Sequence, residues 1–217
     1  MLGLWDDAPF SARLHTRIRA WTAPFEALES FVPVSGRILE IGCGHGVFTT
    51  YLALSSPERT VVGIDIDDEK VALAQTIAAR LRADEGSVAF EHRPSGELPE
   101  EAEGWDAVVF ADVLYLLHPS DRVGLIERCV AALAPGGLLI VKEVDTTPKF
   151  KARLAQFQEF IATRVVRITR GDTMSFPSVV ELTKEMQDAG LSTRSARLDK
   201  GYLHPHCVVI GSRTSPA

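Results

Sequence analysis

The sequence has few cysteines, and their spacing suits neither cross-linking nor metal binding. Cys43, Cys129 and Cys207 are the whole set in 217 residues, an odd number, and no two of them form a CxxC pair. Disulfide frameworks and structural zinc sites normally show an even set or closely spaced pairs. The sequence therefore favours neither, and no metal is expected. The pattern fits a reducing compartment, so we expect a cytoplasmic protein.

Long hydrophobic runs and a positive net charge are also missing. No stretch approaches the roughly 20 apolar residues of a membrane span. The N-terminus, MLGLWDDAPF, lacks the basic and apolar regions of a secretory signal. The net charge of −6 argues against a nucleic-acid partner, because nucleic acid selects a basic surface. Hydrophobic residues make up 46% of the chain, too many for a disordered protein.

What the sequence does contain is a regular alternation of apolar and amphipathic segments. Near-continuous apolar runs predict parallel strands covered on both faces, over Arg37–Ile41, Thr60–Ile64, Ser87–Glu91, Asp106–Phe110 and Leu138–Val141. Helices are expected between them, over Val47–Ser55, Asp68–Ala83 and Pro119–Leu133, and Pro135-Gly136-Gly137 is expected to terminate the last one. This alternation predicts an α/β fold of the Rossmann-like, doubly wound kind.

The C-terminal part has a different pattern. Amphipathic helices are expected over Phe150–Val166 and Pro177–Ala189, followed by strands over Ser192–Leu198 and Cys207–Ser212. The short connection between these strands predicts an antiparallel hairpin. The sheet would then have seven strands, mostly parallel, with an antiparallel C-terminal strand. We expect a single domain with a helical cap over 1–35, a core over 36–145, helices over 146–190 and the hairpin over 191–213.

The clearest local signal is a glycine-rich turn after the first strand. Residues 39–46 read LEIGCGHG, so Gly42, Gly44 and Gly46 alternate just before a helix. Glycine allows a sharp turn and lets a ligand touch the backbone, and the helix beyond presents unpaired N–H groups. Asp65 ends the second strand, where a carboxylate can accept hydrogen bonds from a ribose. Together these features predict a nucleoside-containing ligand at the carboxyl edge of the sheet.

Two features discriminate between nucleoside ligands. Val47 occupies the sixth place of the motif, where a dinucleotide fingerprint has Gly or Ala, and no GxxxxGK[ST] sequence is present. Glu40 puts an acid at the entrance of the turn, which suits a ligand with an ammonium group better than a pyrophosphate. A nicotinamide-dependent dehydrogenase remains the alternative enzyme class.

These residues resemble the class I S-adenosylmethionine-dependent methyltransferases over about residues 36–145. ILEIGCGHG is similar to the glycine motif of that family, and GID is similar to its ribose-binding segment. WDAVVFADVLYLL is similar to the motif of the fourth strand, and LAPGGLLIVKE to that of the fifth. The resemblance implies that S-adenosylmethionine is the cofactor and S-adenosylhomocysteine the product. Segment 36–145 would then be the cofactor-binding core, and segment 146–190 would lie on the acceptor side.

The resemblance also implies a set of cofactor-binding residues. Ile66 would pack on the adenine, and the fourth-strand motif would line the methionine and methyl region. Family members often carry an acid after the third strand that contacts the adenine, where this chain has Pro94; Ser95, Gly96 or Glu97 is expected to replace it. The expected cofactor-binding set is Glu40, Gly42, Cys43, Gly44, Gly46, Asp65, Ile66, Ser95, Gly96, Glu97, Ala111 and Asp112.

The sequence says less about the methyl acceptor than about the cofactor. The chain lacks the Asn-Pro-Pro-Tyr type motif used on planar amines and the Pro-Cys pair used on pyrimidines, so a small acceptor methylated on oxygen is favoured. Many family members have His-His after the fourth strand, where this chain has Tyr115-Leu116. We predict Glu143 as the proton acceptor and Tyr115 as an orienting hydroxyl. The alternative is a capped loop and ordinary polar surface. His204 and His206 lack a third ligand for a metal.

The charge distribution is uneven. Residues 11–25 and residues 145–175 each sum to +3, so the remainder carries −12. If both segments cover the acceptor site, an anionic or carrier-tethered small molecule is the expected partner, of a monomer or homodimer. Solvated helix faces are the alternative. An adenosylmethionine-binding sensor without turnover, and a macromolecule methyltransferase, also remain open.

Overall fold

The computed structural model describes residues 1–82, 86–94, 97–101, 103–145, 175–198, 200, 202 and 205–213. The expected helix over Phe150–Val166 lies outside these residues. The helices are η1 (Leu2–Trp5), α1 (Phe10–Thr22), α2 (Phe25–Glu29), α3 (Val47–Ser55), α4 (Asp68–Ala78), η2 (Leu114–Leu116), α5 (Pro119–Ala132) and α7 (Val179–Asp188). The strands are β1 (Gly36–Ile41), β2 (Arg59–Asp65), β3 (Ser87–His92), β4 (Trp105–Ala111), β5 (Leu133–Val144), β6 (Leu191–Arg197) and β7 (His206–Arg213).

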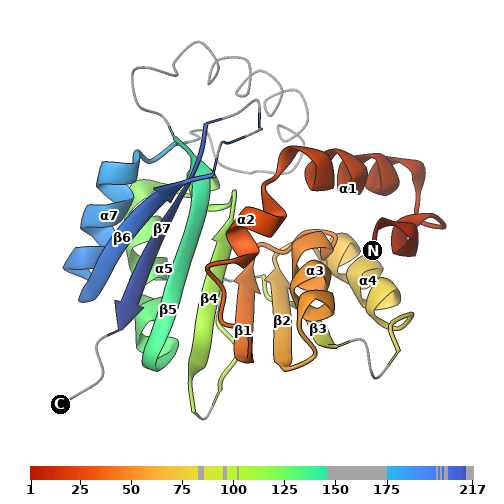
Figure 1. Ribbon diagram of the computed structural model, residues 1–217, viewed down its shortest axis with the longest axis horizontal. Helices are drawn as coiled ribbons and strands as arrows, with labels where there is room; N and C mark the ends of the chain where they lie inside the picture. The colour runs from red at the N-terminus through yellow and green to blue at the C-terminus, as the bar shows by residue number, and fades with distance from the viewer. Residues whose placement is uncertain are drawn as a thin grey trace.

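The strands form one seven-stranded sheet in the order β3-β2-β1-β4-β5-β7-β6 (Figure 1). Strands β1 to β5 pair in parallel, and β7 pairs antiparallel with both β5 and β6. The expected doubly wound sheet and C-terminal hairpin are therefore confirmed. The chain order reverses between β1 and β4, and such a reversal opens a crevice at the carboxyl ends of the strands.

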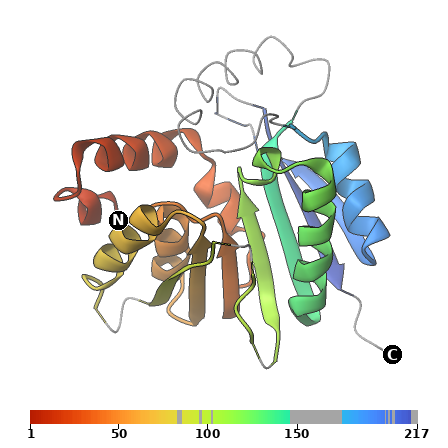
Figure 2. The same ribbon diagram turned by 180° about the vertical axis from the view of Figure 1, so that it is seen from behind.

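Both faces of the sheet are covered, which explains why its strands are almost continuously apolar. Along β4, Ala107, Val109 and Ala111 pack on one side, whereas Val108 and Phe110 pack on the other. The first side is covered by α2, α3 and α4, and the second by α5 and α7, as the views from the front and from behind show (Figures 1 and 2). Side chains at alternate positions of a strand therefore reach opposite faces.

Two expected boundaries were wrong. Strand β5 begins at Leu133 rather than Leu138, because Leu133 pairs with Trp105 and Leu138 pairs with Ala107. The intervening Pro-Gly-Gly segment forms a bulge within β5, and α5 has already ended at Ala132. Helix α4 ends at Ala78 rather than at Ala83, and the chain continues in turns.

The N-terminal segment folds over the carboxyl edge of the sheet. Helix α1 crosses above β2 and α3, and α2 descends in front of β1 (Figure 1). Arg59 at the start of β2 binds the end of this segment. Its buried guanidinium donates to the carbonyls of Val32 and Pro33, and it forms an ion pair with Glu29 at 2.7 Å. The Trp5 indole donates to the carbonyl of His45 at 3.2 Å. Helices η1, α1 and α2 thus occupy this segment, and η1 contacts the glycine turn through Trp5.

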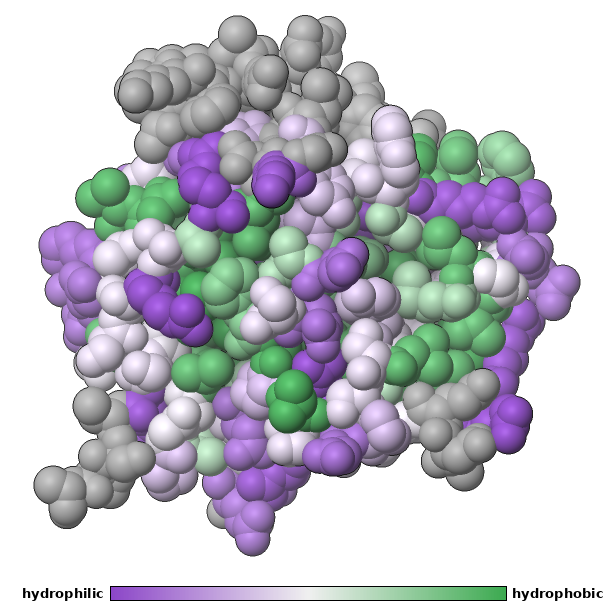
Figure 3. Space-filling model, in the orientation of Figure 1, coloured by the Kyte–Doolittle hydropathy of each residue, from purple (hydrophilic) through white to green (hydrophobic). Residues whose placement is uncertain are grey.

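Among the described residues, no helix combines the length and the apolar character needed to cross a bilayer. Hydrophobic and hydrophilic side chains intermingle on the face drawn in Figure 3, including the region over α1.

Candidate active site

The glycine turn contains three residues whose backbone conformation favours glycine. Gly42, Gly44 and Gly46 have φ of 76°, 53° and 75°. A Cβ at Gly42 would lie 2.5 Å from Val113, and one at Gly46 would lie 2.5 Å from Phe90. A Cβ at Gly44 would meet no atom within 4 Å. Two of the glycines are therefore needed for packing, while the third borders open space that a ligand can enter.

Asp65 organises the turn from the neighbouring strand. One carboxylate oxygen accepts the Gly44 N–H at 2.7 Å, and the other accepts the Asp67 N–H at 3.0 Å. Each oxygen keeps a lone pair for a further donor. Asp67 caps α4 by accepting the Lys70 N–H, and Ile66 between the two acids is 61% exposed. The end of β2 thus presents a carboxylate and an apolar side chain together.

Glu40 lies beneath the turn and is almost fully buried. Its carboxylate accepts a short hydrogen bond from the Thr49 hydroxyl of α3. Burial raises the pKa of Glu40 to about 7, although the Thr49 hydrogen bond and the charge of Arg19 oppose this rise. A carboxyl that is half ionised near neutral pH can gain its full charge when a cationic group binds beside it.

A second group of polar residues lies at the ends of β4 and β5, around Asp112. Asp112 has a φ of 58°, which is rare outside glycine. The Lys142 ammonium lies 2.5 and 2.6 Å from its two oxygens, and the Arg19 guanidinium lies 3.1 Å away. Burial alone would raise the pKa of Asp112, but the two cations outweigh it and lower the pKa to about 2. Asp112 is therefore ionised across the physiological range.

Glu143 points to the other face of β5 from Lys142. One of its oxygens accepts the backbone N–H of Val113 at 3.0 Å and that of Leu114 at 2.8 Å. Burial, with the nearby Asp112 charge, raises the pKa of Glu143 to about 8. These hydrogen bonds hold the loop that contains the left-handed Asp112, so Glu143 fixes the conformation of that loop. Its role as a proton acceptor stays a prediction.

Tyr115 lies in the same loop, on η2. Its ring is buried and stacks on Phe176 with centroids 4.8 Å apart and planes 2° from parallel. Burial, and then the charges of Asp112 and Glu143, raise the pKa of the phenol. The hydroxyl is consequently neutral, and it is a hydrogen-bond donor rather than a base at neutral pH.

The remaining predicted site residues fall into two groups. Cys43 and Ala111 are buried next to the turn and next to Asp112, and Glu97 is exposed after β3. Ser95, Gly96 and His204 lie outside the described residues. His206 is buried, and its Nε2–H donates to the Thr22 carbonyl, 3.1 Å away.

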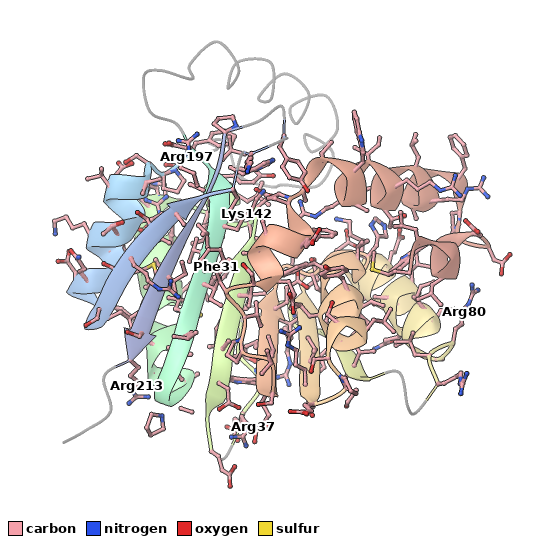
Figure 4. All side chains as sticks on the ribbon, in the orientation of Figure 1. Phe31, Arg37, Arg80, Lys142, Arg197 and Arg213 are labelled. Carbon is pink, nitrogen blue, oxygen red and sulfur yellow. The ribbon has the colours of Figure 1, made fainter. Side chains whose placement is uncertain are left out.

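Arg19 and Lys142 are site residues that were not predicted from the sequence. Figure 4 labels Lys142 at the upper end of β5, close to where α1 and α2 meet. Arg19 lies within the basic segment 11–25, and Lys142 directly follows the expected strand Leu138–Val141. The feature that could have predicted Lys142 is its charge next to an apolar strand. Its neighbours Ile140 and Val141 are fully buried, and lysine is rarely buried without a partner.

Helix α1 completes the site from above. The ring of His15 lies 5.1 Å from that of His45 in the glycine turn, and Arg19 reaches the Ala111 carbonyl at 2.6 Å. The turn after β1 and the loop after β4 therefore share one covering helix.

Comparisons with known proteins agree with this geometry. A family model described as a methyltransferase domain matches residues 38–137. The chain is 29% identical over 205 residues to 27-O-demethylrifamycin SV methyltransferase of Amycolatopsis mediterranei, covering 94% of this chain and 70% of that protein. It is 29% identical to the ubiquinone biosynthesis O-methyltransferase of Xanthomonas axonopodis pv. citri, covering 73% of this chain and 64% of that protein. The chain thus spans about two thirds of the length of these curated relatives.

A solved structure supports the fold. Magnesium protoporphyrin IX methyltransferase from Synechocystis PCC 6803, determined with bound SAH, superposes with a TM-score of 0.67 at 18% identity. The alignment covers 97% of this chain and 91% of that one.

A glycine turn at the point where the strand order reverses, with an acid at the end of the next strand, defines a nucleoside-binding α/β protein. The methyltransferase-domain match spans this turn, and the relatives carry the same activity in their names. Over residues 38–137 the chain is therefore similar to methyltransferase domains, and its fold is that of the class I S-adenosylmethionine-dependent methyltransferases.

The residues present fit S-adenosylmethionine. The open space beside Gly44 lies next to the Asp65 carboxylate, whose remaining lone pairs suit the hydroxyls of a ribose. The exposed Ile66 side chain offers a flat apolar contact for a base, and the buried Glu40 carboxyl suits an ammonium group.

Proposed function

We propose that this protein is an S-adenosylmethionine-dependent methyltransferase that methylates an oxygen atom of a small, anionic or carrier-tethered acceptor. The observation that carries the proposal is the position of α1, a helix with three arginines and no acid, which crosses above β2 and α3 (Figure 1) and reaches the carboxyl end of β4 through Arg19. A cationic cover raises the local concentration of an anionic substrate. The relatives that carry an O-methyltransferase name favour oxygen as the methylated atom.

We propose the following roles for the binding residues. Gly42, Gly44, Gly46 and Cys43 supply the backbone against which the cofactor lies, and Asp65 accepts from its ribose. Ile66 contacts the adenine, and Ser95, Gly96 or Glu97 replaces the acid that often binds the adenine in this family. Glu40, Ala111 and Asp112 border the methionine end. When bound, S-adenosylmethionine supplies a methyl group on a positively charged sulfur. The chain's part is to hold the acceptor oxygen in line with that methyl group.

The acceptor side of this proposal uses Glu143 and Tyr115. Glu143 takes the acceptor's proton, and its raised pKa suits a general base near neutral pH. The neutral Tyr115 hydroxyl orients the acceptor. Because Glu143 also holds two backbone N–H groups, its removal affects both proton transfer and the shape of the loop.

The direct test is a turnover assay with methyl-labelled S-adenosylmethionine and matched pairs of acceptors. Hydroxybenzoic acids and the corresponding hydroxybenzamides offer the same hydroxyl with and without a carboxylate. Label transferred to the acids in preference to the amides supports the proposal. Transfer only to neutral amines contradicts it, and binding of S-adenosylhomocysteine without turnover on any acceptor favours the sensor.

A further inference from the structure

Helix α1 has two faces, and only one of them is turned toward the sheet. Ala12 and Thr16 are buried on the inner face, and Arg19 on the same face reaches the loop after β4. Residues three or four positions apart lie on the same side of a helix. The outer face, defined in this way, carries four residues at such spacings: Phe10, Leu14, Arg17 and Trp21.

The apolar side chains of the outer face are exposed. Trp21 is 83% exposed and Phe10 is 70% exposed, and Leu14 between them is exposed as well. The other two tryptophans, Trp5 and Trp105, are buried in the core. Single exposed apolar residues are common, but several on one stripe form a patch of the kind that marks a contact with another molecule or with a membrane.

The charge on the outer face is mainly positive. The Arg13 guanidinium lies over the Phe10 ring, 5.7 Å from its centroid, and donates to the backbone carbonyl of Asp6. Arg17 pairs with the Asp6 carboxylate at 2.9 Å, and both side chains are largely exposed, so the pair is weak and can be exchanged for another anion. Together with Leu14 these residues line a shallow hollow of about 280 Å³. Basic and aromatic groups therefore lie side by side.

We propose that the outer face of α1 binds the surface of a bilayer that contains anionic lipids. Phe10, Leu14 and Trp21 enter the boundary between the headgroups and the acyl chains, and Arg13 and Arg17 contact lipid phosphates. Tryptophan is favoured at this boundary because its ring is apolar and its N–H is polar. The proposal goes beyond the proposed function, because it requires no methyl transfer.

The charges favour a bilayer over a second copy of this chain. Two copies that met through α1 would bring Arg13 and Arg17 against arginines of the same kind, and like charges across an interface are unfavourable. An anionic bilayer attracts this face, whereas it repels the rest of a chain whose net charge is −6. The bound protein is therefore oriented with α1, and the carboxyl edge of the sheet beneath it, toward the bilayer (Figure 1).

Co-sedimentation with vesicles tests the proposal. Vesicles made from equal parts of phosphatidylcholine and phosphatidylglycerol should bind the wild type roughly 10-fold more tightly than vesicles of phosphatidylcholine alone, because two arginines lie at the surface. Trp21→Ser should lower the affinity for the mixed vesicles roughly 10-fold, since a large apolar side chain is lost from the contact. Trp21 packs little against the fold, so this variant should keep the wild-type melting temperature.

Indole fluorescence gives a second readout. Because Trp5 and Trp105 are already buried, a blue shift of the emission on adding mixed vesicles reports Trp21. The shift should be absent from Trp21→Ser. Arg17→Gln should keep the blue shift at saturating lipid but lower the preference for the mixed vesicles about fivefold, because one cation is removed.

Val180→Ser is the matched control. Val180 is 74% exposed on α7, on the other side of the molecule from α1 (Figure 1), so its loss should leave vesicle affinity unchanged. A wild type that binds neither kind of vesicle overturns the proposal, and so does an equal loss of affinity in Trp21→Ser and Val180→Ser.

Sedimentation velocity without lipid tests the second copy as the occupant. A dimer that Trp21→Ser dissociates and Val180→Ser does not would assign the outer face to self-association and overturn the proposal. A protein that binds vesicles with the contrasts above but methylates no acceptor supports this proposal and contradicts the proposed function. The two proposals therefore fail in different assays.

Discussion

The two sides of the site are built in different ways. On the β1–β2 side, comprising Glu40, residues 42–46 and Asp65, a carboxylate is held by main-chain N–H groups and faces open space. On the β4–β5 side, comprising Asp112, Tyr115, Lys142 and Glu143, charged side chains are buried against one another. The conformation of the first side is determined by glycine backbone, and that of the second side by pairing of buried charges. Substitutions should therefore act differently on the two sides.

The largest effect is expected from Lys142→Met on the β4–β5 side. The substitution leaves the buried Asp112 with the more distant Arg19 as its remaining cation. Breaking a buried ion pair by removing one partner typically costs about 3 kcal/mol or more of unfolding free energy. Urea denaturation measures this loss. Lys184→Met is the control, because Lys184 forms an exposed pair with Asp188 and should cost little. Equal losses of unfolding free energy in both variants would contradict the conclusion that buried ion pairing stabilises the β4–β5 side.

Glu143→Gln separates proton transfer from support of the loop. The amide oxygen of Gln can still accept from Val113 and Leu114, so the fold and the affinity for S-adenosylhomocysteine should be retained. If Glu143 is the proton acceptor, turnover should fall by about 100-fold. Wild-type turnover should also rise with pH through about 8, as the carboxyl ionises, and this rise should be absent from the variant. Unchanged turnover would leave Glu143 with the loop-holding role alone.

The β1–β2 side was largely predictable from sequence because its parts are close together along the chain. The glycine turn and Asp65 are joined by one hydrogen bond over 21 residues, and a strand–turn–helix pattern is enough to predict it. On the β4–β5 side the sequence predicted Asp112, Tyr115 and Glu143 but not what holds them. Arg19 is 93 residues from Asp112, and its contact depends on how α1 is rotated over the sheet. The bulge at Pro135 likewise depends on pairing with β4, which no local pattern encodes.

Alanine at Gly42 and at Gly44 tests whether the glycine turn has one packed and one open position. Both residues have positive φ, so both variants share a strain of about 1 kcal/mol. At Gly42 the new methyl group also overlaps Val113, which should cost roughly 2 kcal/mol more in unfolding free energy. At Gly44 the methyl group enters the open space, so the loss should appear in affinity for S-adenosylhomocysteine instead. Urea denaturation and calorimetry give the two readouts, and identical profiles would contradict the assignment.

The smallest effect concerns the protonation of Glu40, the one group on the β1–β2 side that is buried like those on the other side. Its pKa is raised to about 7 in the folded protein, so the folded state holds a proton that the unfolded state releases near pH 4.5. Glu40 therefore lowers the unfolding free energy progressively as pH rises from about 4.5 to about 7. A bound ammonium group favours the ionised carboxylate, so binding of S-adenosylhomocysteine should release a proton at pH 6. Affinity should rise about 10-fold between pH 6 and pH 8 as the ionised fraction rises.

Calorimetry in two buffers of different ionisation enthalpy counts the protons released on binding. Glu40→Gln is the control for this titration, because it keeps a hydrogen-bond acceptor for Thr49 and cannot ionise. In this variant both the proton release and the pH dependence of affinity should disappear, and stability above pH 7 should exceed that of the wild type. Affinity that is flat between pH 6 and pH 8 in the wild type would mean that Glu40 does not receive the ammonium group.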